Sequence, residues 1–152
     1  MDARPVDDGR CFACGPYAES GLGMRFEETG PDSVACEITL ADHFQGWRGV
    51  AHGGIVAMLL DEGMAYAAAS RGHLGVTAEL KMRFRAPVPL GAPLLVRGRV
   101  EWQRRNVLGV SADVVDAGGA VLAAGEGRFV SRGTLEPGQR LGRFPEKPDD
   151  GR

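Results

Sequence analysis

The sequence predicts an α+β fold in which a curled antiparallel sheet wraps around one long central helix. The chain has 152 residues, of which 43% are apolar and 25% charged, and these values fit one domain. A run without proline from Gly53 to Ser70 is rich in Ala, Leu and Met, and its apolar residues lie on nearly every face of a helix. The segments on either side of this run alternate apolar and polar residues, which is typical of half-buried strands.

The expected strands lie before and after the helix and are joined by short connections. Two strands precede the helix and four follow it, over residues 24–28, 34–40, 80–85, 96–102, 108–114 and 120–130. Turn residues from Asp116 to Gly119 separate the last two strands. The predicted order is therefore β-β-α-β-β-β-β. We divide the chain into a lead-in segment, the domain and a flexible tail, at residues 1–23, 24–131 and 132–152.

Positive charge is concentrated in one segment of the chain. Residues 71–105 contain eight Lys and Arg and two Glu, a charge of +6, although the whole chain carries −2. Such a chain has no general attraction for nucleic acid, whereas a small polyanion fits a local basic cluster. The candidate phosphate ligands in this segment are Arg83, Arg85, Arg104 and Arg105. The alternative is that these arginines only form the solvated face of the sheet.

The cysteines and the N-terminal residues favour a reducing compartment. Cys11, Cys14 and Cys36 form an odd set, and the first ten residues contain no apolar signal-peptide core. We therefore expect a cytoplasmic protein. The longest apolar run, residues 55–60, is much shorter than the ~20 residues of a membrane span, so we expect no membrane association.

Cys11 and Cys14 also have the spacing of zinc ligands. A structural zinc site needs four ligands, however, and no second pair has this spacing. The other candidate ligands are Cys36, His43, His52 and His73. The sequence also lacks a Walker loop, a GxGxxG motif and an EF-hand loop. We therefore expect neither a metal ion nor a cofactor.

The segment with the clearest chemical potential is a glycine-rich turn that leads into the helix. Residues 45–54 read QGWRGVAHGG, so Gly53 and Gly54 open the helix. The first N–H groups of a helix have no partner within it, and they stabilise negative charge that develops on a carbonyl oxygen. The two glycines are therefore candidate donors to an oxyanion. The alternative is that they only permit a tight entry into a packed helix.

An acidic residue, Asp61, lies further along the same helix. Its neighbours at three and four residues are all apolar, namely Ala57, Met58, Met64 and Ala65. A carboxylate in an apolar stripe is costly unless it has a purpose. Asp61 is therefore a candidate catalytic base, and the alternative is that it pairs with an arginine or faces a wet interface. Glu62 is equally surrounded, and the simplest interpretation of this residue is that it pairs with a cation.

The distance between these two features predicts a composite site. Gly53 and Asp61 are eight residues apart, which is about 12 Å along a helix. The N–H donors and the attacking group must both come within about 3–3.5 Å of one carbonyl group. One helix therefore cannot supply both. We expect the helix start of one subunit to meet Asp61 of another in a two-fold dimer.

On these residues, the sequence resembles the hotdog-fold acyl-CoA thioesterases of the phenylacetate-degradation (PaaI-like) type. The resemblance covers residues 11–130. It is carried by the segment from Gln45 to Trp47, the turn His52-Gly53-Gly54 with Asp61 nine residues after the histidine, residues 11–15 and 21–26, and residues 77–87. The resemblance implies a hotdog fold.

The resemblance also implies roles for individual residues. Asp61 matches the acid that acts as general base or nucleophile, and Gly53 with Gly54 matches the amides that polarise the thioester carbonyl. His52 matches a histidine that orients this turn. Thr77 matches a hydroxyl that positions the water or the carboxylate. Gln45 corresponds to an amide side chain near the thioester, although its spacing from His52 differs by one residue from the family pattern.

The function implied by this resemblance is hydrolysis of an acyl-CoA thioester to the free acid and CoA. CoA is then part of the substrate, and the protein is a homodimer or homotetramer that binds neither nucleic acid nor membrane. Two other classes are open, namely a hotdog acyl-thioester hydratase or dehydratase and a non-catalytic acyl-CoA-binding domain. The turn at Gly53 and the acid Asp61 fit hydrolysis better, because a thioester needs only a polarised carbonyl and a carboxylate.

Overall fold

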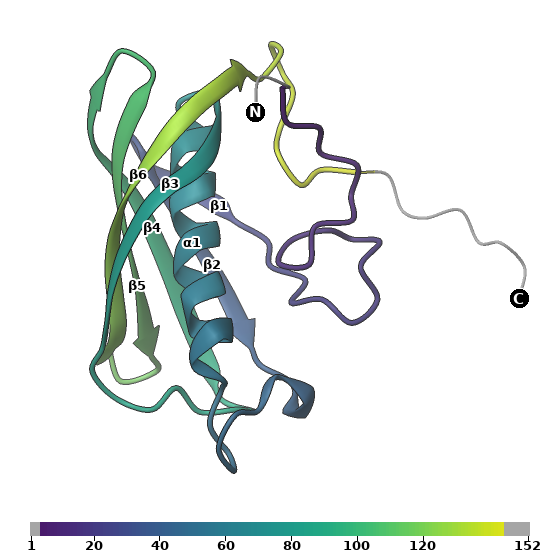
Figure 1. Ribbon diagram of the computed structural model, residues 1–152. Helices are drawn as coiled ribbons and strands as arrows, with labels where there is room; N and C mark the ends of the chain where they lie inside the picture. Colours follow the sequence, from purple (N-terminus) through teal and green to yellow (C-terminus); the bar gives the residue numbers. More distant parts are fainter. Residues whose placement is uncertain (1–3, 145–152) are drawn as a thin grey trace, which may run out of the picture.

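The computed structural model describes residues 4–144, which form one α-helix and six strands. The elements are β1 (Glu27–Gly30), β2 (Ser33–Thr39), the short 3₁₀ helix η1 (Asp42–Phe44), α1 (Gly53–Ser70), β3 (His73–Phe84), β4 (Pro93–Arg104), β5 (Val107–Asp116) and β6 (Val121–Thr134). Figure 1 shows the sheet curving along one side of α1. The expected α+β class and element order are confirmed.

All neighbouring strands in the sheet are antiparallel, and their order is β1-β2-β4-β5-β6-β3. The strands β1 and β3 therefore form its two edges. β3 begins at His73, seven residues before the expected start, because Gly72 with φ 84° lets the chain reverse directly after the helix. Residues 76–79 are exposed on this edge strand, so they lack the alternation that identifies a half-buried strand.

The helix α1 packs on the sheet through side chains that are fully buried. Leu59, Leu60 and Met64 of the helix meet core residues of the sheet such as Leu108 and Phe129. No helix within residues 4–144 is both long enough and apolar enough to cross a membrane. The apolar character of α1 is therefore explained by its burial in the core.

The closest approach between α1 and the sheet lies at two glycines. A Cβ atom on Gly98 of β4 would overlap the carbonyl oxygen of Gly63 in α1. A Cβ on Gly63 would in turn lie 3.3 Å from a methyl carbon of Val96. The two glycines therefore set how near the helix backbone comes to the sheet, and this contact lies two residues from Asp61.

Segments from both ends of the chain cover the face of α1 that points away from the sheet (Figure 1). In the N-terminal segment Ala13, Met24 and Phe26 are buried, and Phe26 stacks on Tyr66 of the helix with 4.5 Å between ring centroids. Because α1 is apolar on nearly every face, its second face also needs cover. Ala13, Cys14 and Leu22 of the expected lead-in are therefore part of the core.

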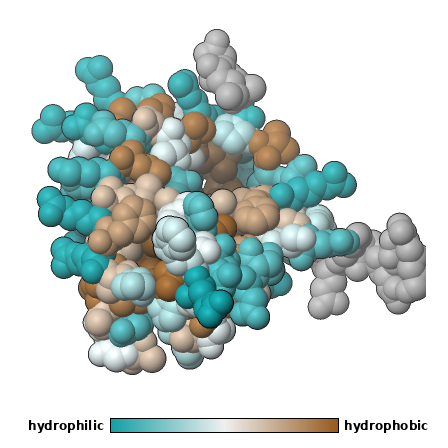
Figure 2. All heavy atoms as spheres, turned by 60° about the horizontal axis from the view of Figure 1, so that its bottom comes forward, coloured by the Kyte–Doolittle hydropathy of each residue, from teal (hydrophilic) through white to brown (hydrophobic). Residues whose placement is uncertain are grey.

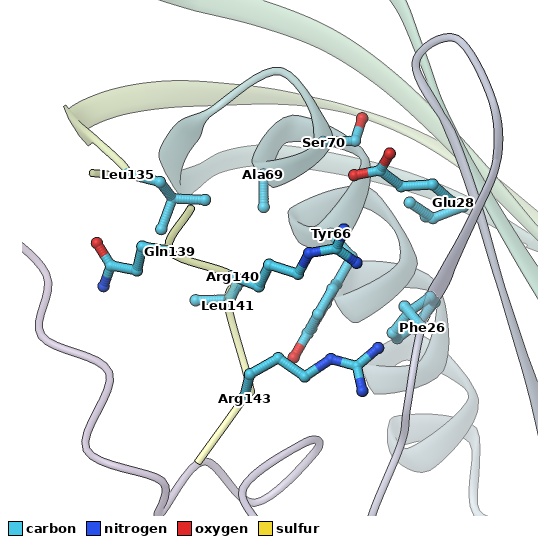
Figure 3. Close-up of a pocket in the computed structure, with 11 residues that line it drawn as sticks. Phe26, Glu28, Tyr66, Ala69, Ser70, Leu135, Gln139, Arg140, Leu141 and Arg143 are labelled. Carbon is cyan, nitrogen blue, oxygen red and sulfur yellow. The ribbon is translucent and has the colours of Figure 1, made fainter. Parts of the chain in front are cut away.

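The C-terminal residues also differ from the expected flexible tail. Residues 132–134 complete β6, and the Leu135 N–H donates to the Gly72 carbonyl at 2.8 Å. Further on, the Gly142 N–H donates to Asp7 at 2.8 Å. Figure 3 shows Arg140, Leu141 and Arg143 beside Tyr66 at a small pocket near the C-terminal end of α1. Residues 145–152 of the expected tail lie outside the described part of the chain.

A substitution at the helix contact tests this packing. We expect Gly98→Ala to lower the free energy of unfolding by about 1–3 kcal/mol, because the added methyl group forces α1 away from β4. Urea unfolding of both proteins measures the difference. The matched control is Gly30→Ala on the exposed edge strand β1, where an added Cβ meets no atom within 4 Å. Equal stability of Gly98→Ala and the original chain would contradict the close contact of α1 with β4 at this position.

Candidate active site

The loop before α1 is held in a tight conformation. Gln45 and Ala51 form an isolated bridge, and the side-chain oxygen of Gln45 accepts a hydrogen bond from the Gly49 N–H at 3.0 Å. Gly49 has φ 74°, and a Cβ on Gly46 would lie 2.9 Å from the Cα of His52. Gln45 therefore shapes the loop that presents His52 to the helix start.

His52 caps the N-terminus of α1. Its Nδ1 accepts a hydrogen bond from the Gly54 N–H at 2.9 Å, so the ring proton of the neutral imidazole lies on Nε2. The carbonyl oxygen of His52 accepts from the N–H groups of Ile55 and Val56. The expected pair of free amides is therefore reduced to one. Within residues 4–144, the Gly53 N–H is the one N–H among the first four of the helix without a hydrogen-bond partner.

The residue with the single free N–H, Gly53, lines an accessible hollow at the start of the helix. Gly53, His52 and Ala51 line this hollow together with Gly46 and Trp47, and its volume is about 340 Å³. Trp47 is 86% exposed. Figure 2 brings this end of the molecule forward and shows apolar residues interspersed with hydrophilic ones on this face. The helix start is therefore accessible to a ligand with both polar and apolar parts.

The structure brings Asp61 and Thr77 together. The Thr77 hydroxyl donates a hydrogen bond to Oδ1 of Asp61 at 2.7 Å. Thr77 lies at an irregularity in β3, where the register against β6 shifts between Thr77 and Glu79. Asp61 is half-buried, and no ion pair in residues 4–144 includes it. The alternative in which an arginine of the same chain neutralises Asp61 is thus not found.

Glu62, rather than Asp61, is the acid that α1 buries. Its side chain is only 9% exposed, and burial raises the pKa of its carboxyl group. No ion pair in the described part of the chain includes Glu62, so the expected cation is not supplied by these residues. Its nearest polar partners are instead the thiols of Cys11 and Cys14. Burial also raises the pKa of the Cys14 thiol.

The four candidate phosphate ligands divide into two pairs. Arg83 and Arg85 lie where β3 ends, next to the loop at the helix start, whereas Arg104 and Arg105 lie at the turn between β4 and β5. Arg104 pairs with Val107 of β5, and Val107 pairs with the residue of β6 that also pairs with Val76 of β3, so Arg104 and Val76 lie at the same level of the sheet. Val76 is seven residues from Arg83, which is roughly 23 Å along the strand. Within one chain the four arginines therefore do not form a common site.

Comparisons with known proteins agree with this arrangement. The model of the thioesterase superfamily matches residues 48–123. Acyl-coenzyme A thioesterase 13 of Homo sapiens is 29% identical over 98 residues, which are 62% of this chain and 70% of that protein. The crystal structure of RHA08564, a thioesterase superfamily protein, has a TM-score of 0.77 at 30% identity, covering 85% of this chain and 68% of that one.

A third comparison concerns the PaaI protein of E. coli, from the phenylacetic acid degradation operon. Its structure has a TM-score of 0.69 at 21% identity, covering 75% of this chain and 83% of that one. PaaI therefore shares the fold, and the hotdog fold expected from the sequence is confirmed. The chain belongs to the thioesterase superfamily, and it is a thioester hydrolase.

The hydrogen bond between Thr77 and Asp61 gives a prediction for the reaction rate. Thr77→Val keeps the side-chain shape but removes the donor. We therefore expect kcat to fall roughly ten- to hundredfold, which corresponds to the free energy of a hydrogen bond to a charged group. The change should leave KM nearly unaltered, because the hydroxyl positions the acid rather than the substrate. Steady-state thioester hydrolysis, followed with a thiol reagent, measures both constants. Thr77→Ser should restore the rate, and equal activity of the Val and Ser variants would refute the role.

Proposed function

We propose that this protein hydrolyses acyl-CoA thioesters to the free acid and CoA, with Asp61 as the general base or nucleophile. The single observation that supports this most is the Asp61 carboxylate, which Thr77 holds by one oxygen while it has no ion-pair partner among residues 4–144. A carboxylate in this state can activate water or attack a carbonyl carbon. Similarity to an acyl-coenzyme A thioesterase supports CoA as the thiol.

The Gly53 N–H is the proposed donor to the thioester carbonyl oxygen. It is exposed at the N-terminus of an 18-residue helix, where the helix dipole adds to its positive character. Gly54 serves indirectly, because its N–H fixes the His52 ring. His52 is thus a positioning residue whose Nε2–H faces away from the capping bond. Gln45 accepts a hydrogen bond from Gly49, and its proposed role is to hold the loop that precedes His52.

The proposed site needs two copies of the chain, because about 12 Å of helix separates Gly53 from Asp61. β3 is a 12-residue edge strand, and such an edge is normally covered. Its side chains Val76 and Phe84 are 42% and 57% exposed. Since Thr77 of this strand holds Asp61, a second copy that pairs along β3 would bring its own groups next to the acid. A two-fold homodimer is therefore the proposed unit, and two such dimers can form a tetramer.

The position of the arginines reduces the proposed ligands of the CoA phosphates from four residues to two. Arg83 and Arg85 are exposed and lead into the segment where the Val88 carbonyl accepts a hydrogen bond from the Ala51 N–H at 2.8 Å. The loop that follows these two arginines therefore lies next to the segment that leads into the helix. Arg104 and Arg105 lie at the other end of the sheet and are less suited to the same substrate.

The role of the Gly53 amide has a direct test. Gly53→Pro removes one N–H and adds the proline ring. The backbone tolerates this ring, since proline is favoured at the first position of a helix and His52 already has the extended ψ of 138° that a following proline requires. An added Cβ at this position meets no atom within 4 Å. We expect kcat to fall about 10²–10³-fold, with an unchanged far-UV circular dichroism spectrum. Gly53→Ala, which keeps the N–H, should retain most of the activity; a fully active Gly53→Pro variant would exclude the amide.

The composite site is tested by mixing two inactive variants. Asp61→Asn should lose several orders of magnitude in kcat, because an amide cannot accept the proton or attack the thioester. In a hybrid dimer of Asp61→Asn and Gly53→Pro, one site has both intact groups and the other has neither. Half of randomly mixed dimers are hybrids, so we expect about a quarter of the original activity to return. Co-expression with two affinity tags isolates the hybrid, and no recovery in that hybrid would contradict a shared site.

A further inference from the structure

Two cysteines and a glutamate form a cluster that the proposed reaction does not use. The sulfur atoms of Cys11 and Cys14 and a carboxylate oxygen of Glu62 all lie within 4.8 Å of one another. The distance from Cys11 Sγ to Glu62 Oε1 is 3.9 Å. The cysteines lie on the N-terminal segment and Glu62 lies on α1, so the cluster joins parts of the chain that are about fifty residues apart.

The charges around Glu62 leave it without a compensating partner. Its side chain is only 9% exposed, and the charged neighbours that act on it, Asp61 and Asp7, are both acidic. No Lys, Arg or His within residues 4–144 forms an ion pair with it. Burying the ionised carboxylate in such surroundings is costly, so the group takes up either a proton or a cation. A positive ion between the carboxylate and the two sulfur atoms would remove this cost.

We propose that Cys11, Cys14 and Glu62 bind one Zn²⁺ ion. Two thiolates and a carboxylate are zinc ligands, whereas Mg²⁺ and Ca²⁺ take oxygen ligands only. Zinc bonds of about 2.3 Å to sulfur and 2.0 Å to oxygen place tetrahedral ligands roughly 3.5–3.8 Å apart. The 3.9 Å between Cys11 Sγ and Glu62 Oε1 is close to this spacing. Binding releases the thiol protons to solvent.

The surroundings of the cluster fit this assignment. Cys11 is exposed, so one side of the cluster is open to solvent, where zinc can enter and water can serve as the fourth ligand. On the inner side, the Tyr66 side chain lies beside the Cys14 thiol, and such outer groups orient metal ligands. The sequence contains no second Cys or His pair that would reveal this site, because the third ligand comes from the helix.

Zinc at this position would fasten the N-terminal segment to α1. Glu62 is the residue directly after Asp61, so an ion bound by Glu62 also fixes the turn of the helix that carries the proposed catalytic acid. The proposed zinc is not part of the reaction, because its ligands lie where the N-terminal segment covers α1, whereas Thr77 holds Asp61 at the edge strand. The ion would therefore hold two parts of the chain together, although with three protein ligands and a water the site is more open than a zinc site closed by four protein ligands.

Metal content gives the first test. The full chain, purified under reducing conditions from medium that contains zinc, should hold about one zinc per chain by plasma mass spectrometry. Cys14→Ser and Glu62→Gln should each lose most of the metal. Cys36→Ser is the matched control, since Cys36 is also a free cysteine but lies outside the cluster, and it should keep the metal. Retention of zinc in Glu62→Gln would overturn the assignment of this ligand.

Two further measurements keep the test independent of activity and of folding. Co²⁺ added to the metal-free protein should give thiolate-to-cobalt absorption in the near ultraviolet, which weakens in Cys11→Ser and stays in Cys36→Ser. A chelator should lower the Tm of the original chain but not that of Glu62→Gln. A reduced protein that holds neither zinc nor cobalt would refute the proposal. A Cys11–Cys14 disulfide found by mass in place of a bound metal would refute it as well.

Discussion

The apolar character of α1 on nearly every face is the constraint on which the rest of the structure depends. One face packs on the sheet, where Gly63 and Gly98 allow close contact between helix and strand. The opposite face cannot be left in water, because burial of apolar surface is the main favourable term in folding. The segments from both chain ends therefore lie across it. A helix that is enclosed in this way stays accessible at its N-terminus, at Asp61 beside β3 and in part at its last residues, Ala69 and Ser70.

This enclosure determines where chemistry can take place. The N–H of Gly53 is available because a helix start has unpaired donors. The side chain of His52 accepts from the next N–H, that of Gly54, and leaves the Gly53 N–H free. Asp61 is available because it lies on the flank, where Thr77 of the edge strand reaches it. The rise of the helix keeps the two groups about 12 Å apart in one chain. The same geometry that protects the core therefore favours a site shared between two copies.

Much of this arrangement follows from the sequence, and the rest depends on contacts that periodicity does not encode. The bounds of α1 and the order of the elements along the chain follow from an uninterrupted apolar run and from alternation, whereas the order of the strands in the sheet does not. The role of Gly54 could not be predicted, because it depends on the side-chain conformation of His52. The four arginines are near in sequence, but antiparallel pairing carries Arg83 and Arg104 to opposite ends of the sheet. Residues 135–144 have no periodic pattern and still pack over the helix.

The two consecutive acids on α1 show why the face of this helix could not be assigned from its sequence. On a helix that is apolar all round, Asp61 and Glu62 have equivalent neighbours, yet one residue turns the side chain by about 100°. That rotation takes Asp61 to the flank, where a hydroxyl holds it, and Glu62 to the enclosed side, where two thiols meet it. Asp61, as the proposed reacting acid, must be accessible to the substrate, whereas the buried Glu62 must be neutralised by groups or ions on the enclosed side of the helix. A single turn of helix thus links the accessible carboxylate to the buried one, and a contact that fixes either side chain also fixes the position of the other.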